Sequence, residues 1–200
     1  MPQRRSRSRR VARGVLHDRA PMPMLVPYTE AAESARRERL GGGDCMMCSL
    51  RDGLAGPRYL LEETEHATTL LCRYARRFGH VLVVLSAHVT ALSDVGQDRW
   101  LAASAQAFRA ATLVERALGA VRCYVGSFGS PRGDLPLSGP HVHLHVIPTY
   151  DVDDRPSRVL SSESGIYVAE EREWAALHAR LAREARAWPA RHAVVFDAPR

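Results

Sequence analysis

Residues 141–146 read HVHLHV, a strict alternation of histidine with apolar residues. Successive side chains of a β-strand point to opposite faces of the sheet, so this alternation predicts a strand. His141, His143 and His145 would then share one face at intervals of about 6.6 Å, with the apolar residues between them in the core. Imidazole can act as nucleophile, acid, base or metal ligand, which makes this face a candidate reactive surface. The alternative is an exposed strand with incidental histidines.

The composition is typical of a globular protein. Of the 200 residues, 46% are hydrophobic and 25% are charged, and a chain of this length can bury a core in one compact domain. The sequence lacks an apolar run of about eighteen residues and an apolar block of the kind found in secretion signals. We therefore expect a cytoplasmic protein that makes no membrane contact.

The positive charge is concentrated at the N-terminus. Residues 1–20 contain seven arginines and one aspartate, a balance of 7 − 1 = +6, which equals the net charge of the whole chain. With little apolar content, this tail is predicted to be disordered. It could contact nucleic acid or anionic lipid, or act as an organelle-targeting segment, but a solvated extension is the favoured interpretation.

Strand-like and helix-like segments alternate along the rest of the chain. The patterns predict a hairpin over 58–71, a buried strand over 80–89, a helix over 98–118 that ends at Gly119, strands over 122–130 and 141–148, and a helix over 170–188. Antiparallel-looking strands with one long inserted helix and a C-terminal helix favour the α+β class.

The four cysteines do not suggest a disulfide framework, since no secretion signal accompanies them. Cys45 and Cys48, in DCMMC, form a Cys-x-x-Cys pair, which is either a redox motif or half of a metal site. A structural zinc site needs four ligands, so two would have to come from elsewhere. Cys72 and Cys123 lie in apolar segments and are interpreted as ordinary buried residues.

Three motifs, in the right order, resemble the histidine triad superfamily of nucleotide hydrolases and transferases. HVHLHVI fits the family signature of three histidines alternating with apolar residues. FGHVLVVLSAHVTALSDV at 78–95 is similar to a family strand followed by a histidine, and CMMC is similar to the zinc half-site of many bacterial members. The resemblance covers roughly residues 44–150. It implies a HIT-like fold with a small antiparallel sheet, and a homodimer.

The resemblance also implies catalytic roles. His143 would attack the α-phosphorus of a nucleotide and form a nucleotidyl-imidazole that water then cleaves. His145 would donate to the phosphate oxygens or the leaving group, and His80 would lie near the α-phosphate, with a structural role as its alternative. Ser138 matches a serine that bonds phosphate. SGPHVH is similar to the uridylyltransferase branch, which has glutamine in place of His145, so the third histidine favours hydrolysis over transfer.

For the metal, the resemblance adds His88 and His141 to Cys45 and Cys48, giving a Cys₂His₂ site. Two thiolates and two imidazoles suit tetrahedral zinc, and four protein ligands leave no open position, so this zinc would be structural. The alternatives for the cysteine pair are a redox role or free thiols.

Some positions depart from the family pattern. GSFG offers Ser127 where many hydrolases carry Asn-x-Gly, and Leu137 stands where a glutamine is usual. Arg132, in a longer loop, could contact a polyphosphate through its guanidinium, or could equally be solvated. The acidic residue that often binds the ribose is replaced near Cys72 and Arg73.

We therefore predict a nucleotide hydrolase that cleaves a phosphoanhydride or phosphoramidate bond through a nucleotidyl-histidine. The alternatives are a nucleotidyltransferase or phosphorylase of the same superfamily, and a nucleotide-binding regulator of low activity. The predicted division is a tail at 1–20, a lead-in segment at 21–43, a HIT-like catalytic domain at 44–155, and a C-terminal extension at 156–200 whose helix packs on the domain.

Overall fold

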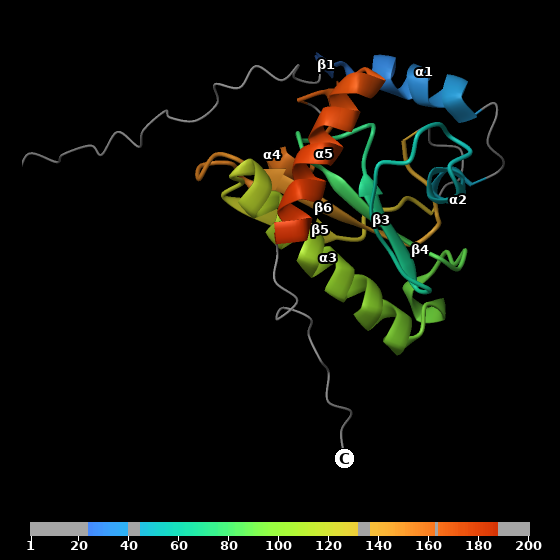
Figure 1. Ribbon diagram of the computed structural model, residues 1–200. Helices are drawn as coiled ribbons and strands as arrows, with labels where there is room; N and C mark the ends of the chain where they lie inside the picture. Colours follow the sequence, from blue (N-terminus) through green and yellow to red (C-terminus); the bar gives the residue numbers. More distant parts are fainter. Residues whose placement is uncertain (1–23, 40–44, 132–136, 163, 188–200) are drawn as a thin grey trace, which may run out of the picture.

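The computed structural model describes residues 24–39, 45–131, 137–162 and 164–187. Its centre is a five-stranded antiparallel sheet with the strand order β2–β3–β4–β6–β5 (Figure 1). The strands are β2 (Leu60–Glu63), β3 (Ala67–Leu71), β4 (Val81–Leu85), β5 (Arg122–Gly126) and β6 (His143–Thr149). The predicted hairpin corresponds to β2 and β3, and the α+β class is confirmed.

Two long helices pack on one side of the sheet (Figure 1). Helix α3 (Gln97–Leu118) contacts the central strands, and α5 (Glu171–Ala187) contacts α3 and β2. Helix α3 ends where predicted, because Gly119 adopts φ +72°, a left-handed conformation that favours glycine. Helix α5 buries Trp174 and Leu177 one turn apart, so the C-terminal segment contributes to the main core.

Strand β4 is buried on both faces, and its alternation divides the side chains between two cores. Val81, Val83 and Leu85 belong to the core beneath α3. Leu82 and Val84 belong to a second core on the opposite face. The continuous apolar run at this place in the sequence is thus explained by a central strand that is covered on both sides.

Shorter elements surround this second core. Helices α1 (Tyr28–Arg39) and α2 (Met46–Asp52) contribute buried residues to it. Strand β1 (Met24–Val26) pairs antiparallel with β7 (Ile166–Val168), which joins the lead-in segment to the C-terminal extension. The remaining elements are the 3₁₀ turn η1 (Leu92–Asp94) and helix α4 (Pro156–Leu160). Among the described residues, no helix is both long enough and apolar enough to span a bilayer.

The histidine strand begins later than predicted. Strand β6 starts at His143, whose partner in β4 is Val84, and His145 pairs with Leu82. The apolar residues between the histidines are buried in the core, as expected. His141 precedes the ladder and turns toward the cysteine pair, so the prediction of three histidines on one strand is right for two of them.

Candidate active site and metal centre

Side chains from three separate segments meet beside α2. Their ligand atoms all lie within 4.8 Å of one another, and the residues are Cys45, Cys48, His88 and His141. Nδ1 of His141 lies 3.5 Å from Sγ of Cys45 and 3.3 Å from Sγ of Cys48. Nδ1 of His88 lies 3.4 Å from Sγ of Cys48. All four residues predicted as metal ligands therefore meet in one cluster.

These distances fit one metal ion at the centre of the cluster. In a tetrahedral zinc site, with zinc–sulfur bonds of about 2.3 Å and zinc–nitrogen bonds of about 2.05 Å, sulfur and nitrogen ligands lie about 3.6 Å apart. The observed sulfur–nitrogen separations of 3.3–3.5 Å are close to that edge length. The cluster is a candidate metal-binding site whose four positions are filled by protein groups.

Backbone hydrogen bonds orient two of these ligands. Nε2–H of His141 donates to the carbonyl of Leu85 at 3.0 Å, which leaves Nδ1 unprotonated and directed at the thiols. Burial lowers the pKa of His141 to about 4, so the ring is neutral. Cys45 caps the N-terminus of α2, and its sulfur accepts the backbone N–H of Cys48 at 3.5 Å. The four cysteines are free thiols rather than disulfides.

A second group of histidines forms a hydrogen-bonded chain. Nδ1 of His143 lies 2.7 Å from the carbonyl oxygen of His141, and Nε2 of His143 lies 3.0 Å from Nε2 of His145. Nδ1 of His145 lies 3.0 Å from Nε2 of His80. The chain ends at the backbone N–H of Arg76, which donates to Nδ1 of His80 at 3.3 Å.

The two ends of this chain determine every tautomer in it. A carbonyl only accepts, so Nδ1 of His143 carries the proton and its Nε2 holds a lone pair. His145 must then donate through Nε2–H, and it accepts through Nδ1 from Nε2–H of His80. His80 in turn accepts the backbone N–H of Arg76. One neutral tautomer of each ring satisfies all of these contacts, and it directs a lone pair of His143 at a donor on His145.

Burial keeps these rings neutral. Desolvation lowers the pKa of His80 and of His145 well below 6.5, and it lowers the pKa of His143 as well. The positive charge of Arg76 acts in the same direction on all three. A neutral imidazole is the nucleophilic form, so the environment favours a ring that can attack an electrophile near neutral pH.

The buried rings should make stability depend on pH. Below about pH 6.5 the unfolded chain binds protons at His80 and His145 that the folded protein does not bind. The free energy of unfolding therefore decreases as the pH is lowered, by about 1.4 kcal/mol per pH unit for each ring. Urea unfolding between about pH 7 and pH 5 measures this slope. His145→Gln should reduce the slope, whereas His66→Gln, a change at the β2–β3 turn, should leave it. A flat profile for the native sequence would contradict neutral burial.

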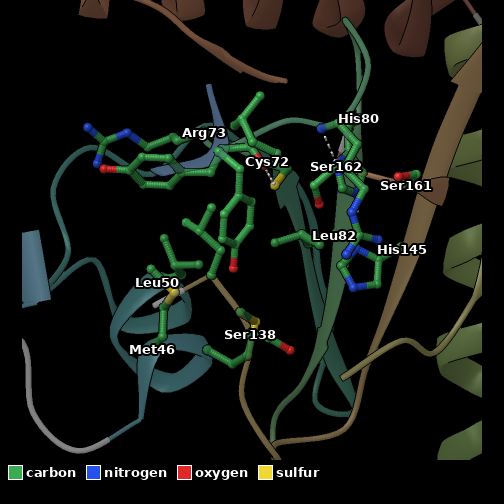
Figure 2. Close-up of a pocket in the computed structure, with 16 residues that line it drawn as sticks. Met46, Leu50, Cys72, Arg73, His80, Leu82, Ser138, His145, Ser161 and Ser162 are labelled. Atoms are coloured by element: carbon green, nitrogen blue, oxygen red, sulfur yellow. Dashed lines mark hydrogen bonds between the residues drawn. The ribbon is translucent and has the colours of Figure 1, made fainter. Parts of the chain in front are cut away.

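A cavity of about 550 Å³ opens beside the histidine chain. His145 and His80 line one end of it, while Met46 and Leu50 of α2 line another part of the wall (Figure 2). Ser138 also lines the cavity, and its Oγ accepts the backbone N–H of Ser130 at 2.9 Å. The volume lies within the range of about 300–1,000 Å³ that is common for small-molecule sites.

His143 itself lies behind this wall. The residue is 2% exposed and does not line the cavity. A Cβ on Gly129 would lie 3.3 Å from Cε1 of His143 and 2.8 Å from the carbonyl oxygen of Gly139, so this loop packs closely over the ring. Nε2 of His143 lies 3.0 Å from Nε2 of His145, whose ring does line the cavity.

A family model and solved structures relate this chain to known proteins. The HIT domain family matches residues 56–152, which include His80, His88 and the three alternating histidines. The chain contains a histidine triad (HIT) domain. The cysteine pair of the metal cluster precedes the matched HIT domain, and β7 and α5 follow it. A search of curated proteins finds no significant match.

Solved structures of HIT proteins share the fold. A Zn-bound histidine triad family protein from Mycobacterium smegmatis aligns with a TM-score of 0.54 and 23% identity over 72% of this chain and 97% of that chain. A hypothetical histidine triad nucleotide-binding protein from Sulfolobus tokodaii aligns with a TM-score of 0.58 and 18% identity, over 72% and 93%. A Hit-like protein involved in cell-cycle regulation from Bartonella henselae aligns at 0.51 and 16%, over 64% and 87%.

The other predicted site residues of the HIT domain fall in different places. Ser127 is exposed on the loop after β5 and does not line the cavity. Arg132 lies outside the described residues. Cys72, near the expected ribose position, does line the cavity; its buried thiol donates to the carbonyl of Tyr74 at 3.2 Å, and burial raises its pKa to about 12.

Several residues around the HIT cavity were not predicted as site residues. Tyr28 of α1, Ser161, Ser162 and Ile166 line it, although they lie outside the matched domain, and Arg76 lines it from within the domain. Neither a motif nor a periodic pattern marks these positions in the sequence. The one relevant sequence feature is the arginine pair in YARR at 74–77, just before His80, which indicates positive charge near this histidine.

Proposed function

We propose that this HIT protein is a nucleotide hydrolase that cleaves a phosphoanhydride or phosphoramidate bond through a covalent intermediate on His143. The substrates in view are dinucleoside polyphosphates and adenylylated small compounds. One observation carries the proposal: Nδ1–H of His143 donates to the carbonyl of His141 at 2.7 Å, which leaves the lone pair on Nε2. Membership of a superfamily of nucleotide hydrolases and transferases supports it, as does the nucleotide-binding description of the Sulfolobus tokodaii protein.

The proposed reaction has two displacements at one phosphorus atom. For an anhydride, the lone pair of His143 Nε2 forms a bond to the α-phosphorus, and the bond to the leaving phosphate breaks with its electron pair. In the free protein, Nε2–H of His145 forms a hydrogen bond of 3.0 Å to Nε2 of His143. During the reaction it turns to the departing oxygen and stabilises the charge of that oxygen. Water next attacks the same phosphorus, and the P–N electron pair returns to Nε2. The product keeps one water proton, and the other goes to solvent.

The remaining predicted residues orient these groups. Nε2–H of His80 donates to Nδ1 of His145 at 3.0 Å and so keeps the donor face of His145 toward the reacting atoms. His80 is a positioning residue in this scheme. Ser138 has its Oγ at the cavity wall, where a hydroxyl can bond a phosphate oxygen.

We also propose that the metal cluster holds a structural zinc. Cys45, Cys48, His88 and His141 supply the two thiolates and two imidazoles that zinc prefers. When bound, the ion links α2 to the start of β6, and it offers no open position to a substrate. The Zn-bound structure from Mycobacterium smegmatis supports this choice of metal.

A mass measurement tests the covalent step. The protein is exposed briefly to a panel of nucleotides and quenched, and its mass should increase by one nucleotidyl group. Digestion should locate the group on the peptide that contains His143, and acid should remove it, since a P–N bond is acid-labile. Turnover without any adduct under rapid quenching, together with full activity of a His143 variant, would overturn the proposal.

One observation favours a second candidate, a nucleotide-binding regulator of low activity. His143 is 2% exposed behind the ring of His145, which would slow access to phosphorus. Binding of a nucleotide without turnover over hours would favour this function. Product analysis with and without added phosphate separates hydrolysis from a transferase or phosphorylase reaction, in which phosphate replaces water.

Gly129 provides a test of the loop above the nucleophile. An alanine Cβ there would lie 2.8 Å from the carbonyl oxygen of Gly139, so the backbone of the loop must move. We expect Gly129→Ala to slow adduct formation by about tenfold, the effect of roughly 1.4 kcal/mol on a barrier. Gly139→Ala is the matched control, because a Cβ there meets nothing within 4 Å. Equal rates in both variants would contradict a close packing of the loop on His143.

We further propose a cytoplasmic homodimer that associates through β5. This strand is an edge of the sheet and pairs only with β6 in the described part of the chain. Val121, Val125 and Phe128, in or beside β5, are 53%, 49% and 39% exposed, which is unusual for apolar side chains on an edge strand. Light scattering of the purified protein should give twice the chain mass, and Val125→Asp should give the monomer.

A further inference from the structure

A cation lies at the histidine end of the cavity. Arg76 lines the cavity together with His80 and His145, and its side chain is half-buried. Its backbone N–H donates to Nδ1 of His80 at 3.3 Å, so the start of the side chain is fixed beside the histidine chain. The guanidinium charge lowers the pKa of both rings, which indicates that the charge lies close to them.

This guanidinium lacks a carboxylate partner within the described part of the chain. Aspartate and glutamate are absent from the described residues that line the cavity. The groups that act on the charge of Arg76 are Cys72 and Tyr28, and neither is a carboxylate. Burial lowers the pKa of Arg76, as expected for a cation that has lost water without gaining an anion. By contrast, Arg73, in the same wall, donates to the carbonyl of Ala55 at 2.6 Å.

A half-desolvated cation of this kind lowers the stability of the empty protein, because a charge is costly to remove from water. An anion bound in the cavity would offset that cost. The cavity also offers hydroxyl groups to an oxyanion, because Ser161 and Ser162 line it together with His80 and His145 (Figure 2). The guanidinium fork matches the oxygen geometry of phosphate better than a point charge does.

The rest of the cavity differs in character. Met46 and Leu50 of α2 give it an apolar wall away from the histidines, whereas Leu82 lies beside His145 on the neighbouring strand (Figure 2). The cavity thus has a cationic end at the histidines and an apolar part beside α2.

We propose that Arg76 binds the phosphate group of the substrate beside His145 and so sets the preference of the cavity for phosphorylated over unphosphorylated ligands. This inference rests on the proposed function, since it concerns the same cavity. No sequence motif marks Arg76 as a phosphate-binding residue. In this proposal the charge of the ligand determines the specificity of the cavity.

Paired ligands test the proposal. Titration calorimetry compares AMP with adenosine, which differ only in the phosphate. The native protein should bind AMP at least about tenfold more tightly than adenosine, and Arg76→Gln should remove most of that difference, as expected for one charge-assisted contact. Arg76→Lys, which keeps the charge without the fork, should retain part of it. Arg183→Gln, on the exposed face of α5 and outside the lining of the cavity, removes the same charge elsewhere and should change nothing.

Stability separates binding from a packing role. Arg76→Gln removes an unpartnered charge, so its melting temperature should equal or exceed that of the native protein. A lower melting temperature with an unchanged AMP-to-adenosine ratio would overturn the proposal in favour of packing. So would a native protein that binds both ligands equally. Loss of AMP discrimination in Arg76→Gln without any adduct on His143 would support the anion site while refuting the covalent mechanism.

Discussion

Replacement of His143 by asparagine should lower the rate of nucleotide hydrolysis by about 10³-fold or more, because it removes the atom that forms the bond to phosphorus. Asparagine can still donate an amide N–H toward the carbonyl of His141, as Nδ1–H does at 2.7 Å. The fold of the strand should therefore survive. Chromatography of the nucleotide products over time measures the residual rate.

Two further variants show whether the loss is specific. His66→Asn alters a partly exposed histidine at the β2–β3 turn, outside the cavity, and should leave the rate unchanged. His145→Gln should slow the reaction but still allow the adduct, because the lone pair of His143 Nε2 remains. Undiminished hydrolysis by the His143 variant would exclude nucleophilic catalysis by this residue.

The parts of the fold that could be predicted are those in which a local pattern decides the structure. The alternation around His143 and His145 specifies a strand and its faces, because a shift of one residue would turn the apolar residues out of the core. Gly119 ends a helix because its φ of +72° is costly for other residues. The metal cluster was predictable through the family resemblance, which joined Cys45 and Cys48 to two distant histidines.

What could not be predicted depends on contacts between distant segments. Strands β1 and β7 have three residues each, too short for a periodic signal, and they exist because they pair with each other. The depth of His143 depends on how the loop at Gly129 packs over it. The exposure of Arg76 to the cavity depends on where α1 and the segment after α4 close the wall. Each of these is a tertiary property that single-residue preferences do not encode.

Removal of the proposed zinc should lower the melting temperature by about 8–16 °C. An ion present at about a thousandfold excess over its dissociation constant stabilises the folded state by about 4 kcal/mol, and each kcal/mol is worth about 2–4 °C for a chain of this size. The physical reason lies in α2, which has only seven residues and joins the sheet through Cys45, Cys48 and its buried methionines. Calorimetric scans before and after a chelator, with metal analysis of each sample, measure the shift.

The cysteines provide the matched controls for this prediction. Cys48→Ser should melt at the lower temperature whether or not a chelator is present, since the cluster has lost a ligand. Cys123→Ala removes a thiol beneath α3, outside the cluster, and should keep the full response to the chelator. Because Met46 and Leu50 belong to α2 and also line the cavity, the metal-free protein should bind AMP more weakly as well. A protein purified without metal that melts at the same temperature as the zinc-loaded form would show that the four ligands do not hold α2 in place.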